Sequence, residues 1–532
     1  MTNLKKYNLP FLGILLVYTI YAAVYIYQTS FIVAGERYFV LFDDAMISMR
    51  YARNLAHGDG LVWNPGGARV EGYTNPLWVV FMAAFHLLPL PASKISVLIQ
   101  ASGAFFLILN LKYVLKIADL ITGSPAVSLL AVILTAFYNP LNNWGLQGME
   151  VSVLMLMITA AIWLSLNCLQ NRSFSPWLYL LLGLSTLVRI DMAVPYIVIL
   201  TVLSFALAEH RRRNLSWGLG ILFLFLISQT VFRLSYYGDL LPNTYYLKMT
   251  GYPLYLRVAH GLYVMLKFMV QMNWVLFLIP FFALIIRRDY TIVLLTLVFL
   301  GQVAYSVYVG GDAWEHRGGS NRYIAIAMPL FFILFIYTAN HIREVLINSI
   351  SPKSIRVRLF SNLGLLLFVL GSMINFNYLT NLRSLERWAL LRQPLFIEGN
   401  KEYVQIAVAV DKITTPQANI AVVSAGAIPY FSNRPAIDLL GKNDPVIARQ
   451  QVHWKSGLAN ISEFRPGHLK WDYSYSIGVL KPDVVVQLWG DTEEARTYLD
   501  NNYVVGGAPD DLPFSLRVDS ANIRWEQVQL AP

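Results

Sequence analysis

The chain has 532 residues, of which 56% are hydrophobic, 14% aromatic and only 14% charged. Because a soluble domain of this length carries about a quarter charged residues, the composition excludes a soluble enzyme, a disordered chain and a fibrous protein. The single cysteine, Cys168, excludes a disulfide framework and any paired-cysteine metal or redox motif. We therefore expect a multispan membrane protein.

The formal net charge of +10 is unevenly divided along the chain. Residues 1–378 contain 26 Lys and Arg against 14 Asp and Glu, whereas residues 379–532 contain 15 against 17. The excess lies in the hydrophobic part, where basic cytoplasmic loops are its usual cause. The charge therefore indicates orientation in a membrane, and no nucleic-acid partner is expected.

Twelve apolar stretches in residues 1–378 are long enough to consider as membrane spans, since a bilayer core needs about 20 apolar residues per helix. They are Leu9–Gln28, Pro76–Pro89, Ile95–Ile117, Ala126–Tyr138, Val151–Leu169, Trp177–Val188, Ala193–Ala208, Trp217–Phe232, Leu262–Ile286, Thr291–Val309, Tyr323–Tyr337 and Leu359–Ile374.

The distribution of basic loops favours eleven spans over twelve. Lys5 and Lys6 indicate a cytoplasmic N-terminus, and twelve spans would put the basic run 211–213 outside, against the positive-inside rule. Omitting Pro76–Pro89, which is short and bounded by prolines, returns every later basic loop to the cytoplasm. We expect that segment to be interfacial or re-entrant, in a first outer loop of about residues 30–94. The acids of the outer loops then face outward, and the first span is expected to be an anchor because it lacks a small-residue cleavage site.

From about residue 379 the composition becomes that of a soluble domain, which the span count places outside the cytoplasm. A helical run near Asn400–Lys412 precedes apolar strands at 420–423, 436–440 and 483–486, with a helix-like segment at Ala425–Phe431. Strands that alternate with helices are typical of a small α/β layer. We expect a membrane module at 1–378 and an extracytoplasmic α/β domain at 379–532. No glycine-rich nucleotide motif is present.

The polar segment Phe42–Leu55 opens the first outer loop. Read as a helix, it places Met46, Met49 and Ala52 on one face and Asp43 and Asp44 at the N-terminus, where the helix dipole favours carboxylates. A capped amphipathic helix on the membrane surface is one interpretation. The glycine-rich polar stretch that follows favours a functional loop.

An ordered series of motifs carries a family resemblance. The series runs DD at 43–44, RYARN at 50–54, HGDGLVWNPG at 57–66, VEGYTNPLW at 70–78, GME at 148–150, LPNTYYLK at 241–248, GGD at 310–312 and DLLGKND at 438–444. In this order it resembles the integral-membrane GT-C glycosyltransferases, particularly the branch of the mycobacterial terminal arabinofuranosyltransferases and their bacterial relatives. The resemblance covers most of the chain and implies a GT-C fold of about eleven spans plus juxtamembrane helices.

The resemblance also implies a reaction. Such an enzyme transfers a sugar, a pentose such as arabinofuranose or a hexose, from a polyprenyl-phosphate donor to a hydroxyl of an envelope glycan or glycolipid, with inversion. A sugar hydroxyl needs a carboxylate to accept its proton, and the family likeness favours Asp43 as base over Asp44, although the sequence does not separate the two. The leaving lipid phosphate needs cations and hydrogen-bond donors.

The expected site residues fall into three groups. The catalytic candidates are Asp43 and Asp44. The candidates for donor phosphate or sugar are Arg50, Arg53, Glu150, Arg189, Asp191, Asn243, Lys248, Asp312, Arg317 and Arg322. The candidates on the acceptor side are Glu71, Tyr73, Asn75 and His468.

Two of these clusters have other interpretations. Asp312, Glu315 and His316 could bind a metal, but their spacing is unlike that of structural sites, so no cofactor is expected to be required and a divalent cation is not favoured. Arg189 and Asp191 sit at an outer membrane boundary, where a helix-ending salt bridge explains them as well as a donor contact does.

A transporter or flippase for a lipid-linked glycan is the alternative function. Transport predicts charges in the middle of spans and repeated halves, whereas the acids here gather in outer loops and no internal repeat is visible. Lys267 and Gln271 are exceptions within one span. A scaffold that only binds glycolipid is a third possibility.

Overall fold

A computed structural model describes residues 8–312, 315, 321–350, 354–509 and 511–531. In this part of the chain, seven helices are long and apolar enough to cross a membrane. They are α1 (Asn8–Gln28), α4 (Ala92–Thr122), α7 (Val151–Asn171), α10 (Arg211–Tyr237), α15 (Tyr290–Val309), α17 (Met328–Ile350) and α18 (Ile355–Asn377).

Two bent helix pairs raise the number of candidate spans to nine. The pair α5 (Pro125–Ala136) and α6 (Asn139–Gly145) bends by 52°, and α12 (Leu254–Gln271) bends by 105° against the segment Trp274–Ile286, which comprises α13 (Trp274–Leu278), η4 (Ile279–Phe282) and α14 (Ala283–Ile286). The chain is therefore a polytopic α-helical membrane protein, as expected.

The expected count of eleven is reached only if two short apolar helices also cross. These are α8 (Pro176–Val188) and α9 (Ala193–Ala206), which the 3-10 turn η2 (Ile190–Met192) joins. With 13 and 14 residues they fall short of the length that spans a bilayer without thinning or tilt adjustments. The helix α3 (Pro76–His86) has only 11 residues, which agrees with its expected interfacial place.

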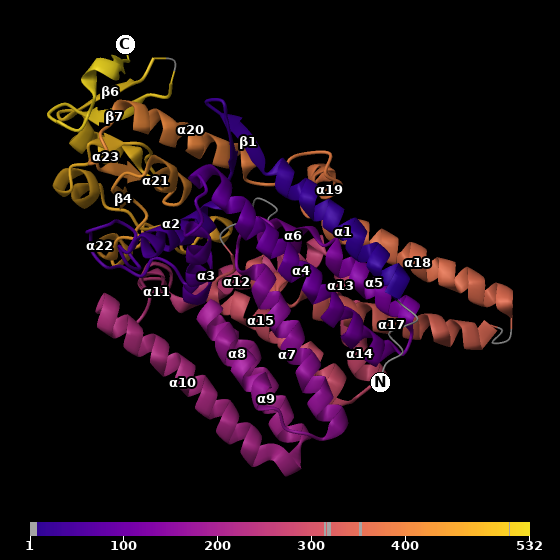
Figure 1. Cartoon of the computed structure of the whole chain (residues 1–532). Helices are drawn as coiled ribbons and strands as arrows, with labels where there is room; N and C mark the ends of the chain where they lie inside the picture. The colour runs from indigo at the N-terminus through magenta and orange to yellow at the C-terminus, as the bar shows by residue number, and fades with distance from the viewer. Residues whose placement is uncertain (1–7, 313–314, 316–320, 351–353, 510, 532) are drawn as a thin grey trace.

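The outward faces of the bundle are apolar. In α1, α10 and α18 only about a fifth of the residues in the most apolar stretch are buried within the protein, whereas 61% are buried in α7. Figure 1 shows α10, α1 and α18 along the outer sides of the bundle. A helix that is apolar all round and half-exposed is suited to face lipid.

The loop that follows α1 is buried within the protein rather than lying on a membrane surface. The antiparallel hairpin β1 (Ser30–Val33) and β2 (Glu36–Phe39) leads into α2 (Asp43–His57), which packs between α3 and α21 (Ala427–Ser432). Nine of the fifteen residues of α2 are buried, including residues on its polar face. The surface-helix interpretation is therefore wrong.

Four short helices surround this loop or connect the spans. They are η3 (Ala208–His210), α11 (Asn243–Met249), α16 (Arg322–Ala325) and α19 (Leu382–Trp388).

The C-terminal part forms the expected small sheet with helices. The strand order is β4-β3-β5-β7-β6-β8, with β3 parallel to β4 and β5 and the remaining pairs antiparallel. The strands are β3 (Ile420–Val422), β4 (Ala436–Asp438), β5 (Val484–Val485), β6 (Tyr503–Gly507), β7 (Phe514–Arg517) and β8 (Gln529–Leu530).

Helices cover this sheet and connect it to the membrane module. The helices and turns of this part are α20 (Ile397–Ile413), α21, α22 (Pro445–Ala448), η6 (Ile461–Glu463), the π-helical turn η7 (Ser474–Val479), α23 (Thr492–Leu499) and η8 (Trp525–Gln527). Figure 1 shows this domain at one end of the bundle, with α20 beside β1.

The strand order identifies the end of the sheet that lies nearest the two acids. From β3 the chain passes to β4 on one side and later to β5 on the other, so the carboxyl end of β3 is a topological switch point, where open α/β sheets bind ligands. The segments that follow β3 and β4 both line a cavity that contains Asp43 and Asp44. The carboxyl ends of β3 and β4 thus lie at the cavity that contains the two acids.

Candidate functional site

Asp43 and Asp44 begin α2 and are fixed from both sides. The main-chain N–H of Phe42 donates to the carbonyl of Gln147 at 3.0 Å, and the Phe42 ring packs against Phe396, with 4.7 Å between ring centroids. The helix start is therefore held between the membrane module and the C-terminal domain.

Asp43 has a main-chain partner and no cation among the described residues within ion-pair distance. The N–H of Ala427 donates to its Oδ1 at 2.8 Å. Burial raises the pKa of Asp43 to about 6, opposed by the hydrogen bond from Ala427, and the charge of Asp44 raises it further. This carboxylate can take up a proton close to neutral pH.

Asp44 stands in the opposite electrostatic environment. Lys442 Nζ lies 3.0 Å from its Oδ1, and Arg322 Nη1 lies 3.1 Å from its Oδ2. Burial acts to raise the pKa of Asp44, but Lys442 and Arg322 outweigh it and hold that pKa well below the usual range. Asp44 is consequently a fixed anion and a poor proton acceptor.

Arg322 connects Asp44 to a second carboxylate. Its Nε and Nη2 donate to the two oxygens of Asp312 at 2.7 and 3.0 Å, while Nη1 reaches Asp44. The guanidinium also lies 5.3 Å from the ring centroid of Trp144. With two carboxylates on one guanidinium, Arg322 positions Asp44 and has little donor capacity left for a phosphate.

Lys248 is a half-buried cation beside the acids that has no partner within the described part of the chain. Within the described part of the chain, no hydrogen bond or ion pair engages its ammonium, and its stem packs near Gly467. Burial, with the nearby charge of Lys442, lowers the pKa of Lys248 to about 8. Lys248 lines three neighbouring cavities at once.

Two of the three cavities are lined by one or both acids, and Lys248 connects the third to them. A central cavity of about 60 Å³ contains Asp44, Asn75 and Arg189. We call the second the membrane-side cavity; it has about 170 Å³ and extends along α12 and α15 past His260, Tyr305 and Val309. The third, the domain-side cavity, has about 150 Å³ and contains both acids together with Ser424, Lys442, His468 and Trp489.

His468 and Trp489 form the wall of the domain-side cavity opposite α2. Their ring centroids lie 5.8 Å apart, and the Trp489 indole donates to the His468 carbonyl at 2.9 Å. Burial and the charge of Lys248 lower the pKa of His468 to about 4, which keeps the imidazole neutral. An aromatic wall beside carboxylates is a surface on which a sugar ring can stack.

Glu150, Arg189 and Asp191 are joined in one buried network. Arg189 binds both oxygens of Asp191, at 2.6 and 2.9 Å, and contacts Glu150 at 3.2 Å. Glu150 also accepts from the amide of Asn75 at 3.0 Å. Because these charges satisfy one another, the geometry favours the salt-bridge interpretation of Arg189 and Asp191, although Arg189 and Glu150 still line the central cavity.

Arg50 and Arg53 hold the C-terminal domain against α2. Arg50 donates to the carbonyls of Trp63, Pro429 and Arg434, and Arg53 donates to the carbonyl of Tyr430 at 2.7 Å. Neither arginine lines any of the three cavities. The structure thus gives them a docking role that differs from the expected contact to donor phosphate.

The remaining acceptor-side candidates and the donor-side candidate Asn243 are also engaged. Glu71 forms an ion pair with Arg233, a residue that the sequence interpretation did not include. The Tyr73 hydroxyl lies 2.8 Å from that of Tyr237, and Tyr73 and Asn75 line the central cavity. Asn243 donates to the carbonyls of Gly441 and Lys442, at 2.9 and 3.0 Å, and so holds the loop that carries Lys442.

Arg317 lies outside the described residues, so its expected role stays a prediction. Across the described ranges, no group of three or more His, Cys, Asp and Glu is arranged to hold a metal ion. Asp312 is bound to Arg322, and Glu315 accepts from Asn321 at 2.5 Å.

The sequence interpretation missed three contributions from the C-terminal domain. These are the ammonium of Lys442, the N–H of Ala427 and the ring of Trp489. Lys442 follows β4 within the motif DLLGKND, so its place after a parallel strand was a usable signal. Ala427 contributes only its main chain, which no side-chain motif reveals.

Comparison with known proteins identifies similar sequences and folds. Residues 393–519 match the model of a domain of unknown function, DUF8728. A terminal β-(1→2)-arabinofuranosyltransferase of Mycobacterium tuberculosis is 28% identical over 218 residues. That match covers 38% of this chain and 34% of the relative, so it spans about a third of the relative's length.

The fold is shared with solved membrane glycosyltransferases. ArnT from Cupriavidus metallidurans in the apo state superposes with a TM-score of 0.57 at 12% identity, over 97% of this chain and 98% of that one. The same protein bound to undecaprenyl phosphate gives 0.53 at 12% identity over 80% and 86%. The apo oligosaccharyltransferase of Archaeoglobus fulgidus gives 0.56 at 11% identity over 98% and 76%. The chain therefore has the GT-C fold.

Proposed function

We propose that this GT-C membrane protein is an inverting glycosyltransferase that moves a sugar from a polyprenyl-phosphate donor to a hydroxyl of an envelope glycan or glycolipid, with Asp43 as general base. The contrast between the two acids at the start of α2 carries the proposal. Asp43 has a pKa raised to about 6 and no cationic partner in the described chain, whereas two cations hold Asp44 ionised.

The reaction then proceeds by one displacement. The acceptor oxygen attacks the anomeric carbon, its proton passes to the Asp43 carboxylate, and the bond from the anomeric carbon to the phosphate oxygen breaks. The products are the new glycoside, inverted at the anomeric carbon, and a polyprenyl phosphate. A general base of this kind contributes about 10²–10⁴-fold to the rate.

Lys248 is proposed to bind the leaving phosphate. Its ammonium faces the cavities without a partner among the described residues, and it stands between the acids and the membrane-side cavity. Preorganised cations stabilise the charge that develops on a leaving phosphate. The membrane-side cavity runs along α12 and α15, so an isoprenoid chain can follow these helices into lipid. ArnT, which shares the fold, has been solved with undecaprenyl phosphate bound.

The acceptor hydroxyl is proposed to meet Asp43 in the domain-side cavity. Trp489 and His468 supply a stacking wall there, and Ser424 follows the carboxyl end of β3. The similarity to an arabinofuranosyltransferase supports a pentofuranose as the sugar to test first. We place the site at the outer face of the cytoplasmic membrane, because the basic loops of residues 1–378 are expected on the other side.

The test is a transfer assay on the purified full-length protein in nanodiscs. Polyprenyl-phosphate arabinofuranose and a polyprenyl-phosphate hexose are each incubated with an envelope glycan extract, and the anomeric configuration of the product is read by NMR. The wild type should give an inverted product and the double variant Asp43→Asn/Asp44→Asn none. Asp59→Asn, an exposed acid two residues past α2, is the matched control. Transfer by the double variant at the wild-type rate, or a retained configuration, would contradict the proposal.

A further inference from the structure

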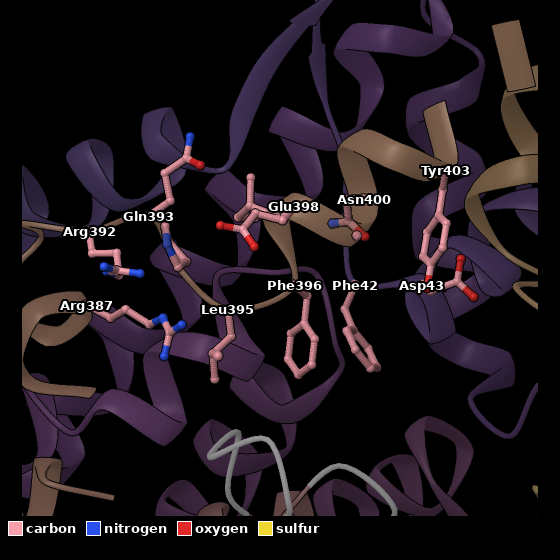
Figure 2. A pocket seen from close by; sticks show the side chains of 13 residues that line it. Phe42, Asp43, Arg387, Arg392, Gln393, Leu395, Phe396, Glu398, Asn400 and Tyr403 are labelled. Atoms are coloured by element: carbon pink, nitrogen blue, oxygen red, sulfur yellow. The ribbon is translucent and has the colours of Figure 1, made fainter. Parts of the chain in front are cut away.

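A fourth cavity lies on the other side of Asp43 and belongs to none of the roles described above. It has about 320 Å³ and is formed by the segment that joins the membrane module to the C-terminal domain; we call it the linker cavity. Its walls are Phe42, Asp43, Arg387, Tyr403 and residues 392–400. Figure 2 shows Asp43 and Tyr403 at one end, Arg387 and Arg392 at the other, and Glu398 between them.

The linker cavity lies where α1 ends and the outer domain begins. The Tyr21 hydroxyl of α1 donates to the carbonyl of Trp388 at 3.1 Å, and the Gln28 amide donates to that of Leu390 at 2.7 Å. Leu391, next to these contacts, has an exposed fraction of 82%. The cavity is therefore beside the end of a membrane span, with an apolar side chain exposed at its edge.

The side chains of the linker cavity are suited to an anionic carbohydrate. No hydrogen bond engages the Arg387 side chain within the described chain, and its Nε is shielded from solvent without a partner. Arg392 forms a half-exposed pair with Glu386, at 3.2 Å. Glu398 and Gln393 add exposed polar groups that can bind hydroxyls.

Two residues in or beside the cavity wall have unusual backbone geometry. Phe396 has φ 74° and Leu390 has φ 58°, both in the left-handed region, which side chains with a Cβ rarely adopt. Such conformations persist only where the surrounding structure maintains them, and they cluster at ligand sites. Phe396 is the N-cap residue of α20, whose first turn lines the cavity.

The linker cavity shares wall residues with the domain-side cavity. Asp43 and Tyr403 line both this cavity and the domain-side cavity. Lys248, in contrast, lines the domain-side and membrane-side cavities and not the linker cavity. The two ends of the site thus offer separate cations, Lys248 on one side of Asp43 and Arg387 on the other.

We propose that the linker cavity binds the acceptor, a glycan that carries an anionic group such as a phosphate or carboxylate, with Arg387 as the contact to that anion. This inference rests on the proposed function, because it assigns the acceptor of the same reaction. It assigns each anionic group its own cation: the donor phosphate binds Lys248, and the acceptor anion binds Arg387. The acceptor hydroxyl then extends past Tyr403 to Asp43.

The test measures binding to the full-length protein in phosphatidylcholine nanodiscs by microscale thermophoresis. Undecaprenyl phosphate is first titrated alone and is then kept saturating to fill the donor side. Glucose 6-phosphate, dodecyl phosphate and uncharged glucose are titrated next. A tenfold tighter dissociation constant for dodecyl phosphate than for glucose 6-phosphate indicates a lipid-borne acceptor, and equal constants indicate a soluble anionic glycan.

Two variants and two matched controls probe the cavity. Arg387→Gln should weaken binding of the anionic probes about tenfold, whereas Arg383→Gln, an exposed arginine on the same helix, should change it less than twofold. Gly399→Leu should fill the cavity and abolish binding, because a Cβ at Gly399 meets only the Tyr403 ring, at 3.9 Å, and fits without strain. Gly364→Leu, with open space around it, is its control.

The outcomes separate this inference from the proposed function. If Arg387→Gln and Gly399→Leu bind the sugar phosphate as the wild type does, or if glucose binds as tightly as glucose 6-phosphate, the acceptor assignment is overturned. The donor site is judged independently, by whether Lys248→Gln weakens binding of undecaprenyl phosphate. A Lys248→Gln variant that binds undecaprenyl phosphate normally counts against the proposed donor site and leaves the result on Arg387 unaffected.

Discussion

The two sides of the α2 N-terminus differ in how their charges are satisfied. On the Asp44 side, Lys442, Arg322 and Asp312 form a continuous set of ion pairs. On the Asp43 side, the carboxylate has a main-chain hydrogen bond from Ala427 and two cavities that adjoin it.

Neighbouring residues of the same type therefore acquire opposite roles from their surroundings alone. Burial without an ion-pair partner among the described residues raises the pKa of Asp43. Burial beside Lys442 and Arg322 leaves the pKa of Asp44 lowered. Under the proposed function, Asp44 serves to position groups and Asp43 to accept the proton. The following experiments test that division.

Asp43→Asn is expected to have the largest effect. Because the amide cannot accept the proton of the acceptor hydroxyl, kcat should fall by about 10²–10⁴-fold. Asp44→Asn should lower kcat by a smaller factor, since Asp44 forms ion pairs with Lys442 and Arg322 and is not the proposed base. Initial rates of sugar transfer with both substrates saturating give the comparison. A larger loss for Asp44→Asn than for Asp43→Asn would reverse the assignment of the two acids.

Lys248→Gln should mainly impair donor use. Loss of a charge-assisted hydrogen bond costs about 1.5–3 kcal/mol, which corresponds to a KM for the donor about 10–100-fold higher. The KM for the acceptor should change little. Steady-state kinetics with each substrate varied in turn provide the measurement, and Lys401→Gln, an exposed lysine of α20, serves as control. Equal changes in the two KM values would argue against a donor-specific role.

Gly426→Ala tests the contact between Asp43 and the C-terminal domain. A Cβ at this position would lie 2.0 Å from the main-chain oxygen of Asp43 and 2.7 Å from its Oδ1, so one of the two segments must move. We expect about a tenfold lower kcat, since small displacements of a catalytic group cost one to two orders of magnitude. Gly220→Ala has open space and should be neutral. Normal activity of Gly426→Ala would show that this contact is not needed.

The pH dependence of kcat/KM should show two limbs. Asp43 must be ionised to act as a base, so the rate should fall as the pH drops below about 6. Lys248 must be protonated to bind phosphate, so the rate should also fall above about pH 8. Because Asp44 raises the pKa of Asp43, the variant Asp44→Asn should move the acid limb to lower pH. An acid limb that does not move in this variant would argue against Asp43 as the titrating group.

Removal of divalent cations is expected to have the smallest effect. Lys248, Lys442 and Arg322 place positive charge beside the acids, and charge stabilisation of a leaving phosphate can come from side chains. Transfer rates measured with and without EDTA should agree within about twofold, a range smaller than the single-residue effects above. Loss of activity that Mg²⁺ or Mn²⁺ restores would refute this expectation.

Much of the architecture could be predicted from the sequence because its determinants are local. Span-length apolar runs, the change of composition near residue 379 and the alternation of short strands with helices each depend on neighbouring residues. The exact number of spans did not follow, because α8 and α9 are too short for length alone to decide. The antiparallel strands β6, β7 and β8 also went unpredicted, since their pairing is set by the finished sheet.

The candidate site was predictable in its residue types but not in its pairings. The acids, Lys248 and His468 do line the cavities, whereas Arg50 and Arg53 point to carbonyls more than 370 residues away in sequence. That Lys248 is left without an ion-pair partner among the described residues depends on tertiary contacts, which cannot be read from a sequence motif. The linker cavity, formed by a segment without motifs, gave no signal in the sequence.

The contacts of Arg50, Arg53 and Asp43 with residues 427–434 have a consequence for biosynthesis. The groups that contact the two acids, the Ala427 amide and the Lys442 ammonium, are synthesised 384 and 398 residues after the acids they bind. A nascent chain therefore carries its two acids into the membrane without these partners. Under the proposed function, the site is complete only when the last quarter of the polypeptide has been synthesised and has packed against α2, so a chain that stops before Ala427 should be inactive.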